Sequence, residues 1–235
     1  MEINLKILAV DSSAKACSVA LTDGDKIIGS FFINTALTHS QTLVPMIDAV
    51  LNNTSTELSS VDALAVSVGP GSFTGVRIGV AAVKGMAMPL EKPCVSVSTL
   101  EAMAYNLIND DCVVCAVMDA RCNQVYNALF KIKDGVIERL CEDRALSINE
   151  LYDEIKTYGE KVVLVGDGAE LCYNSYKELT SDVFIAPEHI RYQNATGVAM
   201  AAKVKEHITA TELMPTYLRL PQAERELKKR LENQK

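Results

Sequence analysis

Residues 69–87 read Gly-Pro-Gly-Ser-Phe-Thr-Gly-Val-Arg-Ile-Gly-Val-Ala-Ala-Val-Lys-Gly-Met-Ala, a glycine-rich turn that leads directly into a helix apolar around almost its whole circumference. Residues 61–68 before the turn are mostly apolar, a pattern typical of a strand buried on both faces. One face of the helix can therefore lie on a sheet, while the opposite face needs a second cover. We expect the function of the chain to lie in this region.

The turn has the composition of an anion site, because Gly69, Gly71 and Gly75 free backbone N–H groups at a helix N-terminus. Its spacing matches neither common phosphate loop. A P-loop requires Lys after the second glycine, where Val76 stands, and the dinucleotide fingerprint requires Gly where Thr74 stands. A strand-to-helix connection whose glycines serve turn geometry is therefore favoured over an anion site.

Length and composition limit the class of protein. With 235 residues and 49% hydrophobic content, the chain suits one large domain or two small lobes. No apolar run approaches the roughly 18 residues of a membrane span, and the N-terminus lacks a signal-peptide layout, so we expect a cytoplasmic protein without membrane contact. The seven cysteines fit reduced core thiols. Cys112 and Cys115 form a CxxC on an expected strand, which would point them to opposite faces.

Charge and histidine content argue against two further classes. The formal net charge is −7 and the basic residues are dispersed, so unaided nucleic-acid binding is not expected. The three histidines, His39, His189 and His207, are far apart and lack the i, i+4 spacing of a helical metal pair. We therefore expect no bound metal.

The two halves of the chain repeat one pattern, in which three strands precede a helix, a strand and a helix. Each first strand ends at an aspartate, Asp11 or Asp119. The expected strands and helices of the first half are 7–11, 17–22, 26–33, 40–52, 61–68, 76–88, 95–97 and a helix from 99, and those of the second half are 113–119, 125–131, 136–141, 148–158, 162–165, 170–179 and 195–206. The predicted domains are an N-terminal lobe (1–108) carrying the partner-binding helices, a C-terminal lobe (109–220) and a charged helical tail (221–235) containing Leu227 and Leu231.

Two βββαβα lobes with an aspartate after each first strand resemble the α/β architecture of actin-like ATPases, sugar kinases and Hsp70 proteins. Six motifs narrow the resemblance to the bacterial TsaB (YeaZ) family, which is also called glycoprotease-like. These motifs are Asp11-Ser-Ser, His39-Ser-Gln-Thr-Leu-Val-Pro, the 69–79 turn and helix start, Asp119-Ala-Arg, Val165-Gly-Asp-Gly-Ala and Pro215-Thr-Tyr-Leu-Arg-Leu-Pro.

The resemblance implies a non-catalytic assembly subunit in the synthesis of threonylcarbamoyladenosine in tRNA. Such a subunit would dimerise with a TsaD-type catalytic subunit, support binding of a TsaE-type ATPase, work beside a TsaC-type protein and meet tRNA only through the complex. Self-association as a homodimer is left open. The TsaD enzyme is recognised by a metal-binding histidine pair, and the corresponding residues 95–102 contain no histidine. Metal chemistry and peptidase activity are therefore not expected.

The resemblance also marks a degenerate nucleotide cleft at Asp11, Asp119, Arg121, Gly166 and Gly168. In actin-like ATPases, glycines beside the two aspartates let the backbone approach the phosphates. Here Ser12, Ser13 and Ala120 stand in those places. We expect no tightly bound cofactor, and the sequence leaves open ATP or ADP at the junction with the partner.

The expected partner surface is the helix pair 40–52 and 76–88. Gly75, Gly79 and Ala82 would form a shallow groove for a partner helix, so Gly79→Arg should weaken association more than folding. The alternative is that both helices merely cover the sheet, although the second carries only Arg77 and Lys84 as charges. The predicted partner residues are Leu43, Ile47, Val50, Leu51, Gly75, Arg77, Ile78, Gly79, Ala82, Val83 and Met86.

A second hypothesis is a stand-alone actin-like ATPase or small-molecule kinase, based on Asp11, Asp119 and the 166–168 segment. It predicts tight binding of magnesium and ATP, whereas the assembly hypothesis predicts weak binding. The sequence leaves the stoichiometry and the monomer or homodimer state undecided.

Overall fold

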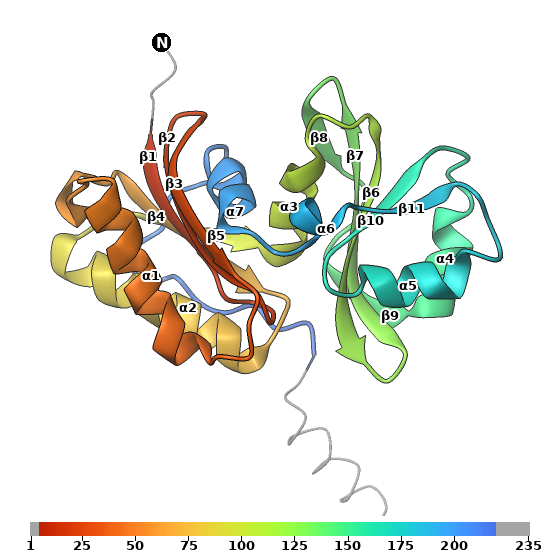
Figure 1. The fold of residues 1–235 in the computed structure, drawn as a ribbon, viewed down its shortest axis with the longest axis horizontal. Helices are drawn as coiled ribbons and strands as arrows, with labels where there is room; N and C mark the ends of the chain where they lie inside the picture. Colours follow the sequence, from red (N-terminus) through yellow and green to blue (C-terminus); the bar gives the residue numbers. More distant parts are fainter. Residues whose placement is uncertain (1–4, 220–235) are drawn as a thin grey trace, which may run out of the picture.

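A computed structural model describes residues 5–219, which form two lobes built on two mixed sheets (Figure 1). β1 pairs antiparallel with β2 and parallel with β4, and β6 likewise pairs antiparallel with β7 and parallel with β10. The predicted duplication and the two-lobed actin-like fold class are thereby confirmed. The first sheet, in the order β3-β2-β1-β4-β5, comprises β1 (Lys6–Asp11), β2 (Cys17–Asp23), β3 (Lys26–Ile33), β4 (Ala63–Gly69) and β5 (Cys94–Ser98). The second, in the order β11-β10-β6-β7-β8 with β9 beside β7, comprises β6 (Cys112–Arg121), β7 (Gln124–Lys133), β8 (Val136–Arg139), β9 (Arg144–Ser147), β10 (Val162–Val165) and β11 (Val183–Ile185).

The helices form two outer layers and one inner layer (Figure 1). The helices α1 (His39–Asn53) and α2 (Phe73–Ala87) cover the outer face of the first sheet, and α4 (Ile148–Ile155) and α5 (Ala169–Tyr176) cover that of the second. Between the sheets lie α3 (Thr99–Ala104), α6 (Glu188–Arg191) and α7 (Ala195–Ala202). Three single turns of 3₁₀ helix occupy Leu58–Ser60, Met88–Leu90 and Tyr105–Leu107. The lobes therefore share an interior helical layer.

The inner helices are exchanged between the lobes. Leu100 and Met103 of α3 join the core of the second sheet, whereas Val198 and Ala199 of α7 join the core of the first. The sequence-based division placed residues 195–206 in the C-terminal lobe, and the structure instead packs α7 on the N-terminal sheet. The physical reason is that α7 is apolar around most of its circumference, so its sequence does not show whether it packs on the first sheet or the second.

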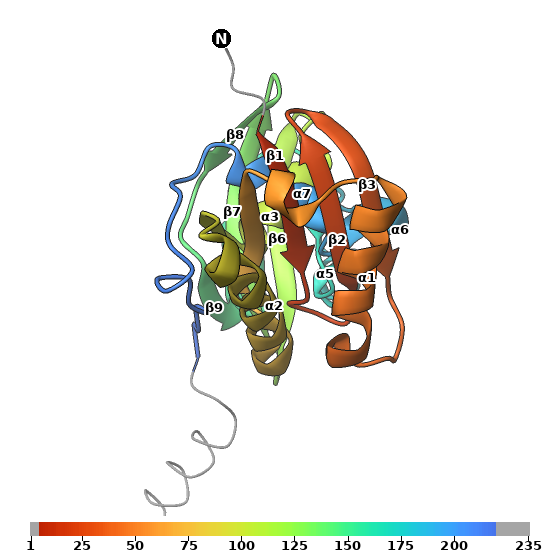
Figure 2. The ribbon, with the colours of Figure 1, turned by 90° about the vertical axis from the view of Figure 1, so that its left-hand side faces the viewer.

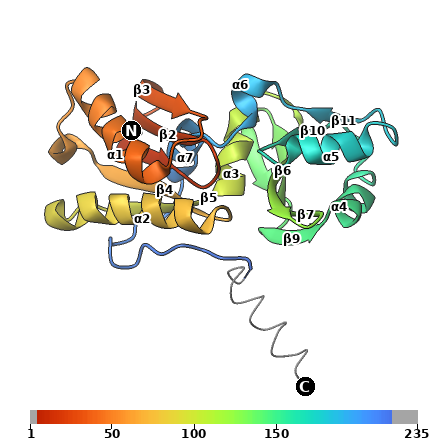
Figure 3. The ribbon, with the colours of Figure 1, turned by 60° about the horizontal axis from the view of Figure 1, so that its bottom comes forward.

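Residues 207–219, called the strap below, return along α2 toward the second lobe (Figures 2 and 3). The strap begins as a bridge between Cys94 and Ile208, and the amide of Thr216 donates to the carbonyl of Val68 at 2.7 Å. At its far end, Arg219 donates to the carbonyl of Ala120 in the second lobe at 3.0 Å. The predicted helix with Leu227 and Leu231 lies outside the described residues.

Five of the seven cysteines are buried free thiols. Cys112 and Cys115 lie in the cores on opposite faces of the second sheet, as predicted from their spacing on β6. All seven cysteines are free, and Cys122 is the one that is exposed. No helix within residues 5–219 combines the length and apolar character needed to cross a membrane.

Candidate functional site

A cleft of about 630 Å³ separates the lobes where β1 and β6 end. It lies between the α2 N-terminus and the hairpin that joins β6 to β7. The first lobe contributes Ser13, Ala14, Lys15, Gly71, Ser72, Phe73 and Thr74, and the second contributes Met118, Asp119, Ala120, Arg121, Tyr126 and Asp167. This cleft is the position of the predicted degenerate nucleotide site.

Asp11 belongs to the interior of the first lobe and does not line the cleft. Its Oδ1 accepts hydrogen bonds from the amide and hydroxyl of Ser13 at 2.9 and 2.7 Å, and its Oδ2 accepts from the hydroxyl of Ser67 at 2.6 Å. Burial raises the pKa of Asp11 above its usual value, although these donors act in the opposite direction. The predicted cofactor role of Asp11 is therefore corrected to an internal structural role.

Two of the five predicted cleft residues, Asp119 and Arg121, line the cleft and are exposed. The Oδ1 of Asp119 accepts a hydrogen bond from the amide of Arg121 at 2.7 Å, which holds the hairpin turn. Gly166 and Gly168 are buried behind the cleft. A Cβ on Gly166 would overlap the carbonyl of Val117, so the close approach of two backbones requires this glycine, and neither glycine lines the cleft.

Sequence reasoning missed Lys15 and Asp167 as cleft residues. Asp167 accepts a hydrogen bond from Gln193 Nε2 at 2.9 Å. Loss of hydration in the cleft raises the pKa of Asp167 to about 6, and the charges of Asp119 and Asp11 add to the shift. More than a third of the residue's surface nevertheless stays exposed, so solvent screens this carboxyl. The motif 165–169 contained Asp167, but only the fold brings it opposite Lys15.

The cleft does not fit a metal nucleotide of the actin-like kind. Asp11, one of the two carboxylates that such a site would need, is turned inward, where it accepts three hydrogen bonds from Ser13 and Ser67. No group of three ligating side chains within residues 5–219 could hold a metal ion. The remaining carboxylates, Asp119 and Asp167, would repel phosphates, and among the described residues that line the cleft Lys15 and Arg121 oppose that repulsion.

Six of the predicted partner residues face the first sheet instead of solvent. They belong to the tightly packed interior beneath α1 and α2, namely Leu43, Ile47, Val50, Gly75, Gly79 and Val83. A Cβ on Gly79 would lie 2.5 Å from Ser12 Oγ and 3.3 Å from Val66, so this glycine lets α2 approach the sheet. The predicted partner groove at Gly75 and Gly79 is therefore wrong, and Gly79→Arg would disturb the fold itself.

The outer side of the helix pair is small and apolar. On α2, Ala81 and Gly85 are exposed, and a Cβ on Gly85 would meet no atom of residues 5–219 within 4 Å. On α1, Val44 is 53% exposed. Four predicted residues, Leu51, Ile78, Ala82 and Met86, are partly buried at the edge of this side. We call Val44, Leu51, Ile78, Ala81, Ala82, Gly85 and Met86 the helix-pair surface.

Arg77, the remaining predicted partner residue, is exposed but already bound within the chain. Its Nε donates to the hydroxyl of Tyr217 at 2.7 Å, and its guanidinium lies over the rings of Tyr217 and Phe73. Those two rings stack with centroids 4.6 Å apart. Arg77 thus connects the strap to α2.

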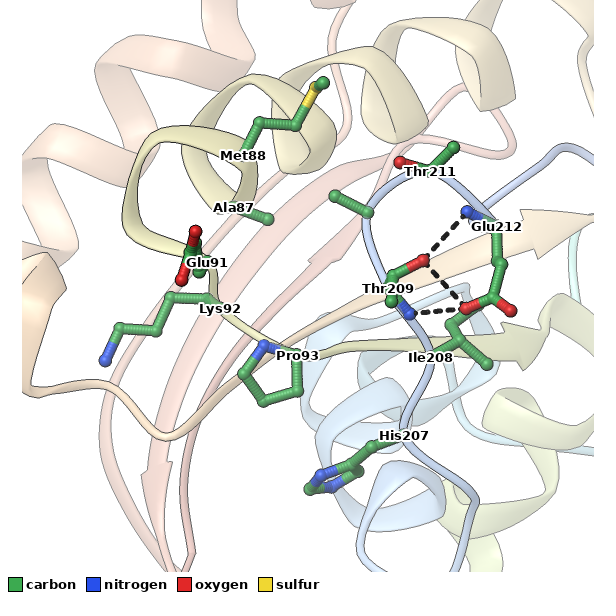
Figure 4. A pocket seen from close by; sticks show the side chains of 11 residues that line it. Ala87, Met88, Glu91, Lys92, Pro93, His207, Ile208, Thr209, Thr211 and Glu212 are labelled. Carbon is green, nitrogen blue, oxygen red and sulfur yellow. Dashed lines mark hydrogen bonds between the residues drawn. The ribbon is translucent and has the colours of Figure 1, made fainter.

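A second cavity, of about 560 Å³, lies at the C-terminal end of α2 (Figure 4). Its apolar lining includes Met88, Pro93 and Ile208. Glu212 accepts from the amide and the hydroxyl of Thr209, both at 2.8 Å, so its carboxylate is engaged in capping a turn. This cavity carries no converging set of catalytic groups.

The comparisons with known proteins agree on one family. The family model described as "TsaD: tRNA N6-adenosine threonylcarbamoyltransferase" matches residues 33–227. The tRNA threonylcarbamoyladenosine biosynthesis protein TsaB of Bacillus subtilis is 31% identical over 225 residues, which cover 94% of this chain and 96% of the relative. TsaB of Haemophilus influenzae is 34% identical and covers 92% and 94% of the two chains.

Solved structures support the same relationship. An uncharacterised Pseudomonas aeruginosa protein described as similar to the peptidase YEAZ superposes with a TM-score of 0.78 at 28% identity, covering 92% of this chain and 100% of the other. YeaZ from the same organism gives 0.75 at 27% identity, with 91% and 100% covered. The ethanolamine utilisation protein EutJ of Carboxydothermus hydrogenoformans, with a TM-score of 0.51 at 14% identity and 83% and 89% covered, shares the fold alone.

Proposed function

Because this chain belongs to the TsaB family of tRNA threonylcarbamoyladenosine biosynthesis proteins, we propose that it acts in that biosynthesis as a non-catalytic assembly subunit. Its partner would be a TsaD-type catalytic subunit. A TsaE-type ATPase would join the resulting pair, and tRNA would meet this chain only through the complex.

The internal bonding of Asp11 supports the non-catalytic part of the proposal. A carboxylate with three hydrogen bonds from Ser13 and Ser67 has little capacity left to hold a metal or a phosphate. Asp119 and Arg121 of the second lobe line the cleft, but Asp11, the matching carboxylate of the first lobe, does not. If ATP or ADP takes part, we place it at the junction with the partner.

The helix-pair surface carries the assembly part of the proposal. Ala81 and Gly85 have little or no side chain, so another helix can approach the outer side of α2 closely. Val44, Ile78 and Met86 supply apolar area around them. Within residues 5–219, no neighbouring atom requires a glycine at position 85. A partner helix packed against α2 would account for it.

The same surface would also serve self-association. In the absence of the catalytic subunit, two copies could pair α1 and α2 around a twofold axis, burying roughly 1,200–2,000 Å² in total if the contact is specific. Homodimer and heterodimer would then compete for one surface. Mass action predicts that adding the TsaD-type subunit dissociates the homodimer.

Ala81→Arg tests this surface directly. Because Ala81 is exposed, the substitution leaves the core of the chain intact, and an unpaired arginine at an interface core should weaken binding of the TsaD-type subunit at least roughly tenfold. Asn174→Arg on α5 of the second lobe is the matched control, since it adds the same charge to another exposed helical position. Affinity is measured by calorimetry and the folded state by the thermal midpoint. Equal affinities for the two variants would place the interface elsewhere.

A further inference from the structure

A half-buried group of charged side chains connects the two lobes on the side where β8 meets α3. Glu101 of α3 accepts from Arg139 of β8 at 3.1 Å and from Lys205, which follows α7, at 2.9 Å. Arg139 also binds Asp143 at 2.7 Å, and Asp143 accepts from the hydroxyl of Ser98 at 2.5 Å. We call Ser98, Glu101, Arg139, Asp143 and Lys205 the interlobe ion cluster.

The members of the cluster come from both lobes. Arg139 and Asp143 belong to the second lobe, whereas Ser98 ends β5 of the first sheet, and Lys205 lies between α7 and the bridge to Cys94. The exposed fractions of the four charged side chains lie between 15% for Glu101 and 29% for Lys205. Partial burial lowers the effective dielectric, so these contacts are stronger than a surface ion pair.

The helical layer beside the cluster leaves little room for sliding. A Cβ on Gly197 of α7 would overlap the carbonyl of Ala102 of α3, so the two helices are in direct backbone contact. Asn106 donates to the carbonyls of Ile190 and Tyr192 at 3.0 and 2.9 Å, which ties the end of α3 to the chain leading into α7. A change in the angle between the lobes would have to shift α3 against α7.

A second tie lies at the cleft. The strap reaches the second lobe through the hydrogen bond from Arg219 to Ala120. The cluster and this tie therefore connect the lobes at two separate places, with α3 and α7 between them. A body held at two such places resists both opening and twisting.

We propose that the interlobe ion cluster fixes the angle between the lobes, so that the cleft keeps one width whether or not nucleotide is present. The chain then presents its helix-pair surface and its second lobe as one rigid body. A partner that contacts both would meet them preorganised, without a hinge motion to restrict on binding.

The width of the cleft can be measured between two spin labels. Native Cys122 stands in the second-lobe hairpin, and Thr74→Cys places the second label on the first-lobe wall while leaving Lys15 in place. Half-buried Cys141 is replaced by serine in all samples. In this background we expect one narrow distance distribution by pulsed electron paramagnetic resonance, unchanged by magnesium and ATP.

Arg139→Gln on β8 and Glu101→Gln on α3 each remove a central member of the cluster, which orients Asp143 toward Ser98 and Glu101 toward Lys205. Both variants should broaden the distribution and shift it to longer distances. Glu160→Gln is the control, because it breaks the exposed Lys131–Glu160 pair on the outer part of the second lobe. If Arg139→Gln does not melt cooperatively, the distance distribution of Glu101→Gln alone tests the proposal. A broad distribution in the unsubstituted cluster, a shift caused by ATP, or unchanged distributions in both variants would overturn the proposal.

Discussion

Ser67 of β4 keeps Asp11 of β1 inside the first lobe by donating a hydrogen bond at 2.6 Å across two neighbouring strands. With the two bonds from Ser13, this contact offsets the cost of burying a carboxyl group in an apolar core. The same contact turns the side chain away from the cleft. Ser67 and Ser13 together thus hold this carboxyl group inside the lobe.

Ser67→Ala should destabilise the chain by about 2 kcal/mol, because one buried oxygen of Asp11 loses its donor. The midpoint of urea unfolding measures the effect. Ser60→Ala is the control, since its hydroxyl is exposed and bonds only to the nearby carbonyl of Glu57. An unfolding midpoint equal to that of the control would mean that Ser67 does not hold Asp11.

Asp167 makes stability depend on pH. Its pKa rises from 3.8 to about 6 on folding, so the folded chain favours the neutral acid. The stability that the neutral form contributes is fully present below pH 3.8 and is lost as the pH rises through about 6. Asp167→Asn can still accept from Gln193 and carries no charge, so it should be the more stable form at pH 7 and should lose this advantage near pH 4. Urea unfolding at several pH values checks this, and an advantage that grows toward low pH would contradict the assignment.

At the scale of the element, two sides of α2 carry small residues, one that faces the first sheet and one that faces solvent. Its inner side carries Gly75 and Gly79, where the helix lies against Ser12 and Val66. Its outer side carries Ala81 and Gly85, and no atom in the described part of the chain restricts a side chain at position 85. The helix therefore approaches its own sheet on one side and stays open to another body on the other.

Substitution of Gly79 or Gly85 by alanine should separate packing on the first sheet from association with another body. Gly85→Ala removes the helix penalty of glycine and should raise the stability of the isolated chain by up to about 1 kcal/mol, while the added methyl group weakens association. Gly79→Ala should destabilise the chain, because its Cβ would stand 2.5 Å from Ser12 Oγ. The thermal midpoint measures the stability of each variant, and sedimentation at low concentration measures its association. Tighter association of Gly85→Ala would argue against helix contact at this position.

The sequence pattern predicted α2 as 76–88, against Phe73–Ala87 in the structure. One side of α2 packs on the first sheet, whereas the expected second cover of its outer side stays a prediction. The pattern could not tell which side faces the sheet, because small and apolar residues occupy both. The assignment of Gly75, Gly79 and Val83 to the partner therefore failed. Charge would have resolved the two sides, but α2 carries only Arg77 and Lys84, and both bind the strap.

At the scale of the whole molecule, the duplicated lobes follow from the sequence because each half repeats the same strand and helix order. The exchange of α3 and α7 does not follow, since connection lengths do not show on which sheet an apolar helix packs. The short elements β9, β11 and α6, of four, three and four residues, were missed because such lengths show no periodicity. The cleft residues Lys15 and Asp167 became neighbours only through the pairing of the lobes.

The two-lobed shape alone suggests an ATPase, and the isolated chain should nevertheless bind magnesium and ATP weakly. The cleft combines an inward Asp11 with the unneutralised carboxylates of Asp119 and Asp167. Calorimetric titration of the isolated chain measures this. Tight stoichiometric binding would favour the stand-alone ATPase or kinase hypothesis.

The central claim is that this chain contributes a surface, and not its cleft, to tRNA modification. The measurement that tests it most directly is the amount of threonylcarbamoyladenosine formed on tRNA in a mixture reconstituted with TsaC-, TsaD- and TsaE-type proteins. The account predicts that the Asp119→Asn, Arg121→Gln double variant keeps most of the activity of the unsubstituted chain, whereas Ala81→Arg loses at least roughly tenfold. Full activity with Ala81→Arg together with loss in the cleft variant would contradict it.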